Sequence, residues 1–257
     1  MVTWENKKLE SLMRIETGNR NTEDRINGGR YPFFVRSQQV EKIDNYNYDG
    51  EAVLTAGDGV GTGKIFHYIN GKFDAHQRVY IMSQFNGIDG KYFFYFFSEN
   101  FLSEVEKYTA KSSVDSVRRT MIADMCIQLP PLPEQQFIAT ALSDVDAYIV
   151  ALERLIAKKR AIKQGAMQEL LTGKRRLPGF DDEWVNLNLA TNSTLKARIG
   201  WQGLTTAEYL DAGYAYLVTG TDFNNGKIIW NGCHFVEKRR YNQDSNIQIE
   251  NGDVLIT

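Results

Sequence analysis

Residues 129–173 read LPPLPEQQFIATALSDVDAYIVALERLIAKKRAIKQGAMQELLTG, and this stretch decides the architecture. Pro133 suits a first helical turn because the N–H that proline lacks is unbonded there anyway. Glu134 favours the positive end of a helix dipole, and Gly173 is typical of the residue just after a helix. We therefore expect one helix from Glu134 to Thr172, about 58 Å long at 1.5 Å per residue.

Apolar side chains recur along this predicted helix at alternating spacings of four and three residues, which is the pattern of a coiled-coil helix. They are Ile138, Leu142, Val145, Ile149, Leu152 and Ile156, and we call them the apolar stripe. Burying such side chains contributes about 1.5 kcal/mol each, so a partner should cover the stripe. A core helix packed on its own domain is the alternative. Because the sequence predicts no second helix of this kind, we expect a homodimer.

Charge is balanced over the whole chain but not within it. The chain has 30 Lys and Arg against 32 Asp and Glu, which excludes a globally basic coat, so any nucleic-acid surface must be local. Residues 153–176 carry a net charge of +6, and residues 177–257 carry −4. The basic run is either a solvated helix face or a surface for phosphate or an acidic partner protein.

Segments before the predicted helix resemble segments after it, in the same order. The pairs are 4–9 with 184–189, 31–35 with 214–218, and 50–55 with 252–257. The spacing between partners grows, which places an insertion around 219–251 in the second copy. Ordered matches of this kind predict a duplicated domain. Because the second copy ends inside a predicted strand at 254–256, we interpret it as truncated.

Short apolar strands alternate with glycine turns before the long helix, as at Asn27-Gly28-Gly29. Residues 90–108 favour a helix with aromatic side chains at spacing four, although the run at 92–97 could form a strand by propensity. We expect an α+β chain with a small, irregular β-rich domain, a long coiled-coil spacer helix and the start of a second copy. The predicted boundaries are 1–130, 131–176 and 177–257.

A glycine-rich segment, GDGVGTGK at 57–64, invites comparison with phosphate-binding loops. It fails the phosphate-loop pattern because Asp58 stands where the first glycine belongs. Ile65 also stands where Ser or Thr would hold magnesium. A tight glycine turn between two strands is therefore the better interpretation.

Histidine and cysteine residues give no sign of a metal or catalytic site. His67, His76 and His234 lack metal-ligand spacing, and Cys126 and Cys233 are far apart. We expect no catalytic residues, no metal and no cofactor. The sequence also has no apolar run of membrane-spanning length and no signal peptide, so we expect a cytoplasmic protein without a membrane partner.

Polar clusters are the better candidates for binding. Arg, Lys, Gln and Ser are the side chains that hold phosphates and read base edges in DNA. Such residues follow the strand at 31–35, occupy predicted turns, and lie between the aromatic helix and the proline-rich entry. Solvated loop residues are the alternative interpretation. The candidates are Arg36, Ser37, Gln38, Gln39, Lys64, His76, Gln77, Arg78, Lys111, Ser112, Ser113, Ser116, Arg118 and Arg119.

A family resemblance covers almost the whole chain. LPPLPEQQFIA at 129–139 and LLTGKRRLPGF at 170–180, with Trp184, closely resemble the spacer of type I restriction–modification specificity subunits. YPFFVRS at 31–37 and DGEAVLTAG at 49–57 resemble a target-recognition domain of the same family. The spacer motif is specific and is not expected by chance.

This resemblance implies a DNA-reading subunit without catalysis. In the family, two target-recognition domains each read one half of a bipartite DNA site. Two long helices pack antiparallel between them and dock the methyltransferase subunits, which the endonuclease–translocase subunits join. Double-stranded DNA and both kinds of subunit are therefore expected partners. The second spacer helix is missing here, and a homodimer would supply it with one helix from each chain.

Two other functions compete with DNA recognition. The first is a coiled-coil scaffold or adaptor protein without DNA specificity. The second is a single-chain modification enzyme with attached recognition domains, against which the lack of methyltransferase and nuclease motifs argues.

Overall fold

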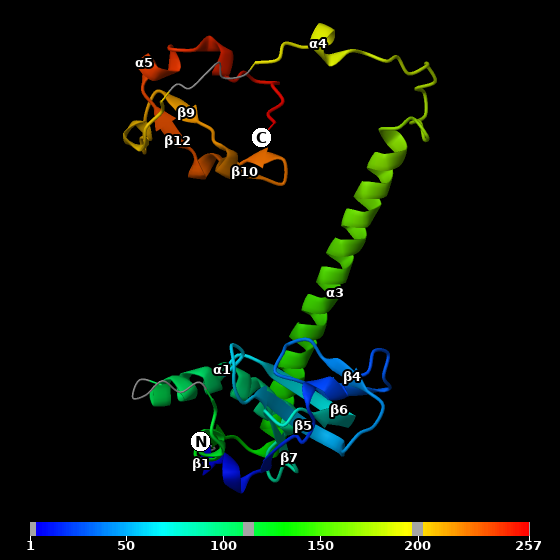
Figure 1. Cartoon of the computed structure of the whole chain (residues 1–257), viewed down its shortest axis with the longest axis vertical. Helices are drawn as coiled ribbons and strands as arrows, with labels where there is room; N and C mark the ends of the chain where they lie inside the picture. Colours follow the sequence, from blue (N-terminus) through cyan, green and yellow to red (C-terminus); the bar gives the residue numbers. More distant parts are fainter. Residues whose placement is uncertain (1–3, 110–115, 197–202, 257) are drawn as a thin grey trace. The chain divides into compact units, whose positions relative to one another are not determined.

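The structure is a computed structural model that describes residues 4–109, 116–196 and 203–256. The chain divides into two units, Met1–Met167 (unit 1) and Gln168–Thr257 (unit 2). Figure 1 shows the β-rich part of unit 1 and the helix α3 (Leu132–Leu170) that leaves it. The mixed α+β content and the long helix agree with the fold class expected from the sequence.

Unit 1 contains a six-stranded sheet in the order β2-β7-β5-β6-β3-β4, antiparallel throughout except for the parallel pair β3 and β6. Its strands are β2 (Arg14–Thr17), β3 (Tyr31–Phe34), β4 (Glu41–Ile43), β5 (Tyr48–Ala56), β6 (Phe66–Ala75) and β7 (Val79–Ser83). A separate antiparallel pair joins β1 (Glu5–Lys8) to β8 (Cys126–Leu129), which leads into α3. Two helices complete the unit before α3, namely α1 (Gly90–Thr109) and α2 (Arg119–Ala123).

Alternating side chains divide the core of unit 1 between the two faces of the sheet. Val53 and Met82 belong to the larger cluster, which α1 and α2 complete. Their neighbours Leu54 and Ile81 belong to a second cluster with Phe34 and other residues of β6 and β7. Both faces are therefore covered by apolar side chains.

The aromatic segment at 90–108 forms the helix α1, as the spacing of its phenylalanines predicted. Phe93, Phe97 and Phe101 are completely buried, and the rings of Phe97 and Phe101 stack with centroids 4.4 Å apart. Strand propensity in this run is overridden because one helical face carries all three rings into the core.

The base of α3 is fixed to unit 1 by a buried side chain, Gln135, which is 1% exposed. Its Oε1 accepts a hydrogen bond from the Asp89 N–H at 2.9 Å, and its Nε2 donates to the Pro130 carbonyl at 2.8 Å. Asp146 lies three turns further along α3, and its carboxylate accepts a hydrogen bond from the Tyr95 hydroxyl of α1 at 2.6 Å. These bonds set the direction in which the helix leaves the domain.

Most of the apolar stripe is exposed. Leu142, Val145, Ile149, Leu152 and Ile156 are between 39% and 56% exposed, so this part of α3 is not a core helix of its own unit. Ile138, at the base of the stripe, is only partly exposed, because its side chain packs against the larger core cluster of unit 1. The helix begins and ends two residues earlier than expected.

Unit 2 has short elements and little buried surface. An antiparallel pair joins β9 (Ala215–Leu217) to β12 (His234–Val236), and a hairpin joins β10 (Phe223–Asn224) to β11 (Lys227–Ile228) through Asn225-Gly226. The short helices are α4 (Leu189–Asn192) and α5 (Lys238–Tyr241). Within 168–196 and 203–256, the buried residues are Cys233, Val236 and Asp222.

The strand predicted at 254–256 does not form, because the structure shows no strand pairing there. A strand needs a neighbour for its backbone N–H and C=O groups, and β propensity alone does not supply one. The six-stranded sheet of unit 1 has no counterpart in the part of unit 2 that the structure describes.

One local arrangement nevertheless occurs in both units. In unit 1 a 3-10 helix at Thr22–Asp24 begins with a capping box between Asn21 and Asp24, and Ile26 N–H then donates to the Lys42 carbonyl of β4 at 2.8 Å. A Cβ atom at Gly29 would lie only 2.7 Å from the backbone nitrogen of Ile43. The glycine thus lets the chain approach β4 closely before it enters β3.

In unit 2 a 3-10 helix at Thr206–Glu208 begins with a capping box between Thr205 and Glu208. Leu210 N–H then donates to the Phe235 carbonyl of β12 at 3.0 Å. A Cβ atom at Gly213 would lie 2.9 Å from the Val236 carbonyl oxygen, just before β9. The capping box, the backbone bond to a facing strand and the close glycine of residues 21–29 therefore recur at residues 205–213.

Candidate nucleic-acid interface

The ends of three strands of unit 1 meet and bring several predicted binding residues together. His76 N–H donates to the Phe34 carbonyl at the end of β3, at 2.9 Å. Gly57 N–H, at the end of β5, donates to the Arg78 carbonyl at 2.7 Å. These bonds place the segment after β3, the glycine-rich loop 57–65 and the turn between β6 and β7 side by side.

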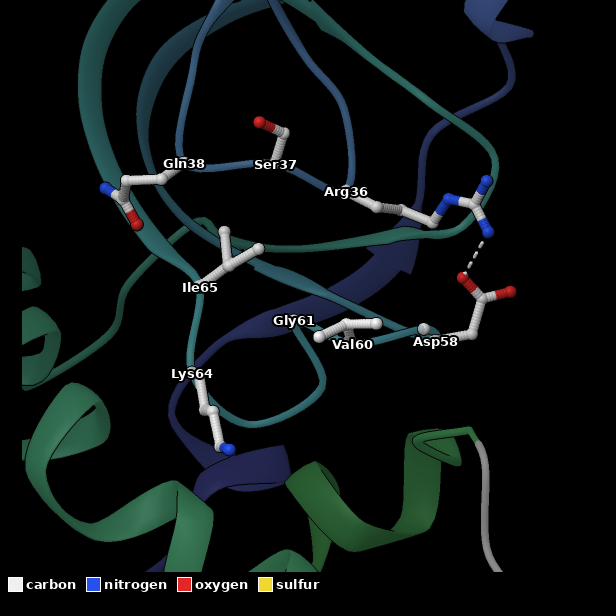
Figure 2. Close-up of a pocket in the computed structure, with 9 residues that line it drawn as sticks. Arg36, Ser37, Gln38, Asp58, Val60, Gly61, Lys64 and Ile65 are labelled. Carbon is white, nitrogen blue, oxygen red and sulfur yellow. Dashed lines mark hydrogen bonds and ion pairs between the residues drawn. The ribbon is translucent and has the colours of Figure 1, made fainter. Parts of the chain in front are cut away.

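A carboxylate that the sequence analysis did not single out, Asp58, lies between two of the predicted cations. Arg36 Nη1 donates to Asp58 Oδ1 at 2.7 Å, and Arg78 Nε lies 3.7 Å from Asp58 Oδ2. Figure 2 shows the Arg36 and Asp58 side chains facing each other across the site. An acidic residue inside a glycine-rich loop was the available signal, but the loop was judged only against phosphate-binding patterns.

These segments enclose an open cleft of about 640 Å³, lined by Arg36–Gln38, residues 58–61, Lys64 and Ile65. Lys64 is exposed, and in Figure 2 its side chain points away from the Arg36–Asp58 pair. Val60 in this loop is fully exposed, although burying an apolar side chain would be favourable in free energy. Cationic, amide and apolar groups that can meet DNA phosphates, base edges and thymine methyls are therefore displayed together.

The glycine-rich loop connects two antiparallel strands, β5 and β6, as predicted for a tight turn. A phosphate-binding loop of the nucleotide type would lead into a helix, whose N-terminus contributes to phosphate binding. Here the loop leads into β6. The loop therefore lacks the strand-to-helix context of a nucleotide phosphate-binding loop, as well as its sequence pattern.

His67 supports the segment that carries Ser37 and Gln38. Its ring is buried, and His67 Nε2 lies 3.0 Å from the Ser37 carbonyl oxygen, to which the neutral ring can donate. Burial lowers the pKa of His67, and this hydrogen bond only partly opposes the effect. Gln39 N–H donates to the Ser37 hydroxyl at 3.0 Å. The side chains of Gln38 and Gln39 are both exposed.

The turn at His76–Arg78 separates its three side chains. His76 is 6% exposed, and its Nδ1 accepts from the Arg78 N–H at 3.0 Å, so this ring shapes the turn and offers no edge to a ligand. Burial and, after it, the charge of Arg36 lower the pKa of His76. Gln77 is exposed and donates to Asn21 Oδ1 at 2.7 Å, and Arg78 is exposed beside Asp58.

The remaining predicted residues either belong to the segment before α2 and its first turn or lie outside the residues that the structure describes. Ser116 forms an isolated β-bridge with Asp58, so it adjoins the cleft. Arg118 is exposed at the start of α2, whereas Arg119 Nε donates to the Ile15 carbonyl of β2 at 3.3 Å. The predicted residues Lys111, Ser112 and Ser113 lie outside the residues that the structure describes.

A comparison with known families decides what this unit is. The model of a family described as "Type I restriction modification DNA specificity domain" matches residues 1–164. The chain belongs to this family. The match covers the β-rich domain, its polar cleft and most of α3, and it confirms the resemblance noted in the sequence. The family is described by DNA specificity, which agrees with the expectation of a non-catalytic chain.

Two curated relatives carry the same designation. The chain is 27% identical over 191 residues to the EcoDI type I restriction enzyme specificity subunit of Escherichia coli, which covers 73% of this chain and 41% of that subunit. It is 26% identical over 236 residues to the MjaVIII specificity subunit of Methanocaldococcus jannaschii, covering 87% of this chain and 52% of that subunit. The chain thus spans about half the length of these relatives.

A solved structure shares the fold. The crystal structure of the S subunit of a type I restriction-modification system from M. genitalium matches with a TM-score of 0.55 and 17% identity, over 84% of this chain and 60% of that chain. The likeness supports the arrangement of a β-rich domain followed by a long helix.

Two further kinds of site are a cluster of metal-ligating side chains and a membrane-spanning helix. Across the described ranges, no group of three or more His, Cys, Asp or Glu side chains could hold a metal ion. No helix in those ranges is both long and apolar enough to cross a membrane.

Proposed function

We propose that this chain recognises a DNA sequence and directs the methyltransferase and endonuclease subunits of a type I restriction–modification complex to it. The observation that carries the proposal is the match to a DNA specificity domain over the unit that displays the polar cleft. The chain itself contributes recognition without catalysis. Its two cysteines are free, which suits the reducing cytoplasm where such a complex acts.

The cleft is the proposed DNA contact of unit 1. Arg36, Arg78 and Lys64 supply positive charge from three different loops, and Gln38 and Gln39 supply exposed amides. Ser37 lines the cleft, Ser116 bridges to Asp58 beside it, Gln77 lies next to Arg78, and His76 supports the turn from inside. Arg118 and Arg119, at the start of α2, belong to the proposal by their residue type. Lys111, Ser112 and Ser113 remain in the proposal on sequence grounds alone.

We further propose that residues 177–257 belong to a second recognition domain, after a first domain at 1–130 and a spacer at 131–176. The local arrangement shared by residues 21–29 and 205–213 supports this, because capping box, backbone bond and close glycine recur in the same order. A chain with two such domains, or a pair of chains, would read a bipartite DNA site.

The exposed part of the apolar stripe, Leu142 to Ile156, is the proposed surface for a second spacer helix. Within this chain's described residues, no other helix comes near its length, so the partner helix is proposed to come from a second copy. The basic run over Lys158–Lys163 on the same helix would face solvent or another subunit of the complex.

Sequence-dependent methylation tests the function as a whole. A host carrying this chain and the methyltransferase of its system should acquire methylated bases at one bipartite motif, detected by sequencing native DNA. A host carrying the methyltransferase alone provides the baseline. If the two methylation maps are identical, the chain does not direct the methyltransferase and the proposal fails.

Binding of purified protein tests the cleft. Arg36→Ala and Arg118→Ala should each weaken DNA binding. An arginine that reads a base should cost about 1–3 kcal/mol of binding free energy for the target sequence, whereas one that holds a phosphate should weaken binding equally for all sequences. Arg30→Ala is the matched control, because Arg30 is an exposed arginine paired with Asp44 outside the cleft. Unchanged affinity for both variants would remove Arg36, which lines the cleft, and Arg118, at the start of α2, from the proposed DNA contact.

Size-exclusion chromatography with light scattering tests whether two copies of the chain pair through the apolar stripe. Ile149→Glu places a charge in the stripe and should convert a dimer to a monomer, because an unpaired carboxylate cannot be buried between helices. Ala151→Glu adds the same charge to another face of the same helix and should leave the dimer intact. Self-association without any DNA preference would instead favour a scaffold or adaptor protein.

A further inference from the structure

Among the described residues that line the cleft, Asp58 is the one acidic side chain, and it connects two strand-end loops that carry cations. Its carboxylate accepts from Arg36 Nη1 at 2.7 Å and lies 3.7 Å from Arg78 Nε. Arg36 follows β3 and Arg78 precedes β7, so the two arginines reach the same carboxylate from different parts of the chain. In Figure 2 the Arg36 side chain extends toward Asp58.

The backbone next to Asp58 is held from two sides, and the carboxylate is less exposed than its two arginine partners. Gly57 N–H donates to the Arg78 carbonyl, and the Gly57 carbonyl accepts from the Val117 N–H, both at 2.7 Å. Asp58 itself forms a β-bridge with Ser116. Its side chain is 21% exposed, against 45% for Arg36 and 62% for Arg78. Asp58 is therefore the least exposed of the three charged side chains, and it lies within reach of both arginines.

A carboxylate does not help a surface that only holds phosphates, because it repels them. It does help an arginine that must read a base. A guanidinium bonded on one side to a carboxylate keeps its other N–H groups in one direction, where its planar fork can meet two acceptors of a guanine. Ordering the arginine before binding also removes part of the entropy cost of binding.

From this geometry we propose that Asp58 is a specificity-determining residue. It positions Arg36, with support from Arg78, for contact with a base edge, and its charge weakens attraction to phosphates of any sequence. Both effects widen the gap in affinity between the target and other DNA. The proposal rests on the proposed DNA recognition by this unit.

Replacing Asp58 by asparagine tests the two effects together, because the side chain keeps its shape and loses its charge. The full chain is titrated with two duplexes and followed by fluorescence anisotropy. One duplex is enriched from a randomised pool by the unmodified protein, and the other is a shuffled duplex of the same composition. Asp58→Asn should bind the shuffled duplex more tightly and the enriched one more weakly, so that the affinity ratio falls by about tenfold.

Asp44→Asn is the matched control. Asp44 pairs with Arg30 on the same unit, with Arg30 Nε 3.8 Å from Asp44 Oδ1, and it does not line the cleft. The substitution changes the net charge by the same amount, so it should change both affinities similarly and leave their ratio intact. A fall in ratio with Asp44→Asn as large as with Asp58→Asn would overturn the proposal.

Arg36→Lys provides a second variant that keeps the charge but loses the planar fork. It should lower the affinity ratio while the salt dependence of binding stays unchanged. If Arg36→Lys keeps full discrimination while Asp58→Asn loses it, Asp58 itself contacts the base and the positioning role is wrong. Equal gains in affinity for both duplexes with Asp58→Asn would also overturn it.

The outcome for the unmodified protein separates this inference from the proposed function. If no duplex is enriched over the shuffled one, DNA recognition itself fails. If the unmodified protein discriminates and Asp58→Asn discriminates equally well with an unchanged melting temperature, only the role of Asp58 fails.

Discussion

The segments before β3 in unit 1 and before β9 in unit 2 share a local arrangement, yet the two units bury their side chains to very different extents. In unit 1, β3 is flanked by β4 on one edge and by β6 on the other. In unit 2, β9 pairs with β12, and no strand among residues 203–256 takes the place of β6. The comparison teaches that the capping box, the close glycine and the first strand pair form locally, whereas the core depends on the strands that follow.

Two aromatic pairs make this contrast measurable. The rings of Phe97 and Phe101 in unit 1 and those of Tyr216 and Phe235 in unit 2 both lie 4.4 Å apart, but Phe97 is completely buried and Phe235 is only half-buried. Phe97→Ala should lower the free energy of unfolding of unit 1 by about 3–5 kcal/mol, since it leaves a cavity. Phe235→Ala should cost unit 2 about 1 kcal/mol.

Hydrogen exchange followed by mass spectrometry reads the two units separately, in peptides from β5 and from β9. Each substitution should change protection in its own unit. Equal losses for the two variants would show that unit 2 has a core as complete as that of unit 1, and the contrast would not stand.

The close glycines test whether the local arrangement is truly repeated. Gly29→Ala and Gly213→Ala each place a Cβ within 3 Å of backbone atoms of the facing strand, so each should destabilise its unit by about 1–3 kcal/mol. Gly165→Ala on α3 meets no atom within 4 Å and should stabilise the helix by about 0.5–1 kcal/mol. Thermal unfolding with exchange readout measures all three. A neutral Gly213→Ala would break the correspondence between the units.

The smallest expected effect is a pH dependence confined to unit 1. The pKa values of His67 and His76 are both lowered in the fold from the ordinary value of 6.5. The unfolded chain therefore binds protons first as pH falls below 6.5, and the free energy of unfolding should decrease from there to the folded pKa values. Above pH 6.5 these groups should have no effect.

Urea unfolding between pH 7.5 and pH 5.5 measures this dependence, a window of about two pH units around the ordinary pKa of histidine. The double variant His67→Gln and His76→Gln should lose it while remaining less stable overall. A pH profile that is the same with and without the two histidines would contradict the assignment.

Sequence patterns predicted the parts of this fold that are decided locally. The heptad spacing and the flanking Pro133 and Gly173 located α3 to within two residues, because helix signals lie within a few turns of one another. The strand expected at 254–256 was wrong because a strand depends on a neighbour that the pattern cannot supply. The partial packing of Ile138 against the domain was not predicted, because the spacing along a helix does not show where the domain begins to cover it.

The candidate site was predicted only in part, because the sequence shows the chemistry of each side chain but not which side chains meet in the fold. Arg36, Lys64 and Arg78 were chosen for their chemistry, and the structure brings their loops together. Asp58 was missed because its partners are 22 and 20 positions away along the chain, and only the folded sheet joins them. Residue type identified the cations, whereas geometry was needed to identify the anion between them.

The bonds of Gln135 have a consequence for mechanics. A helix of 39 residues extends about 58 Å, so it works as a lever whose far end amplifies any change of angle at its base. A tilt of about 10° at Gln135 would displace that far end by about 10 Å, which is three base pairs along DNA at about 3.4 Å each. For the proposed bipartite site, the bonds of Gln135 together with the Tyr95–Asp146 bond would therefore limit the tolerance with which two DNA half-sites are measured against each other.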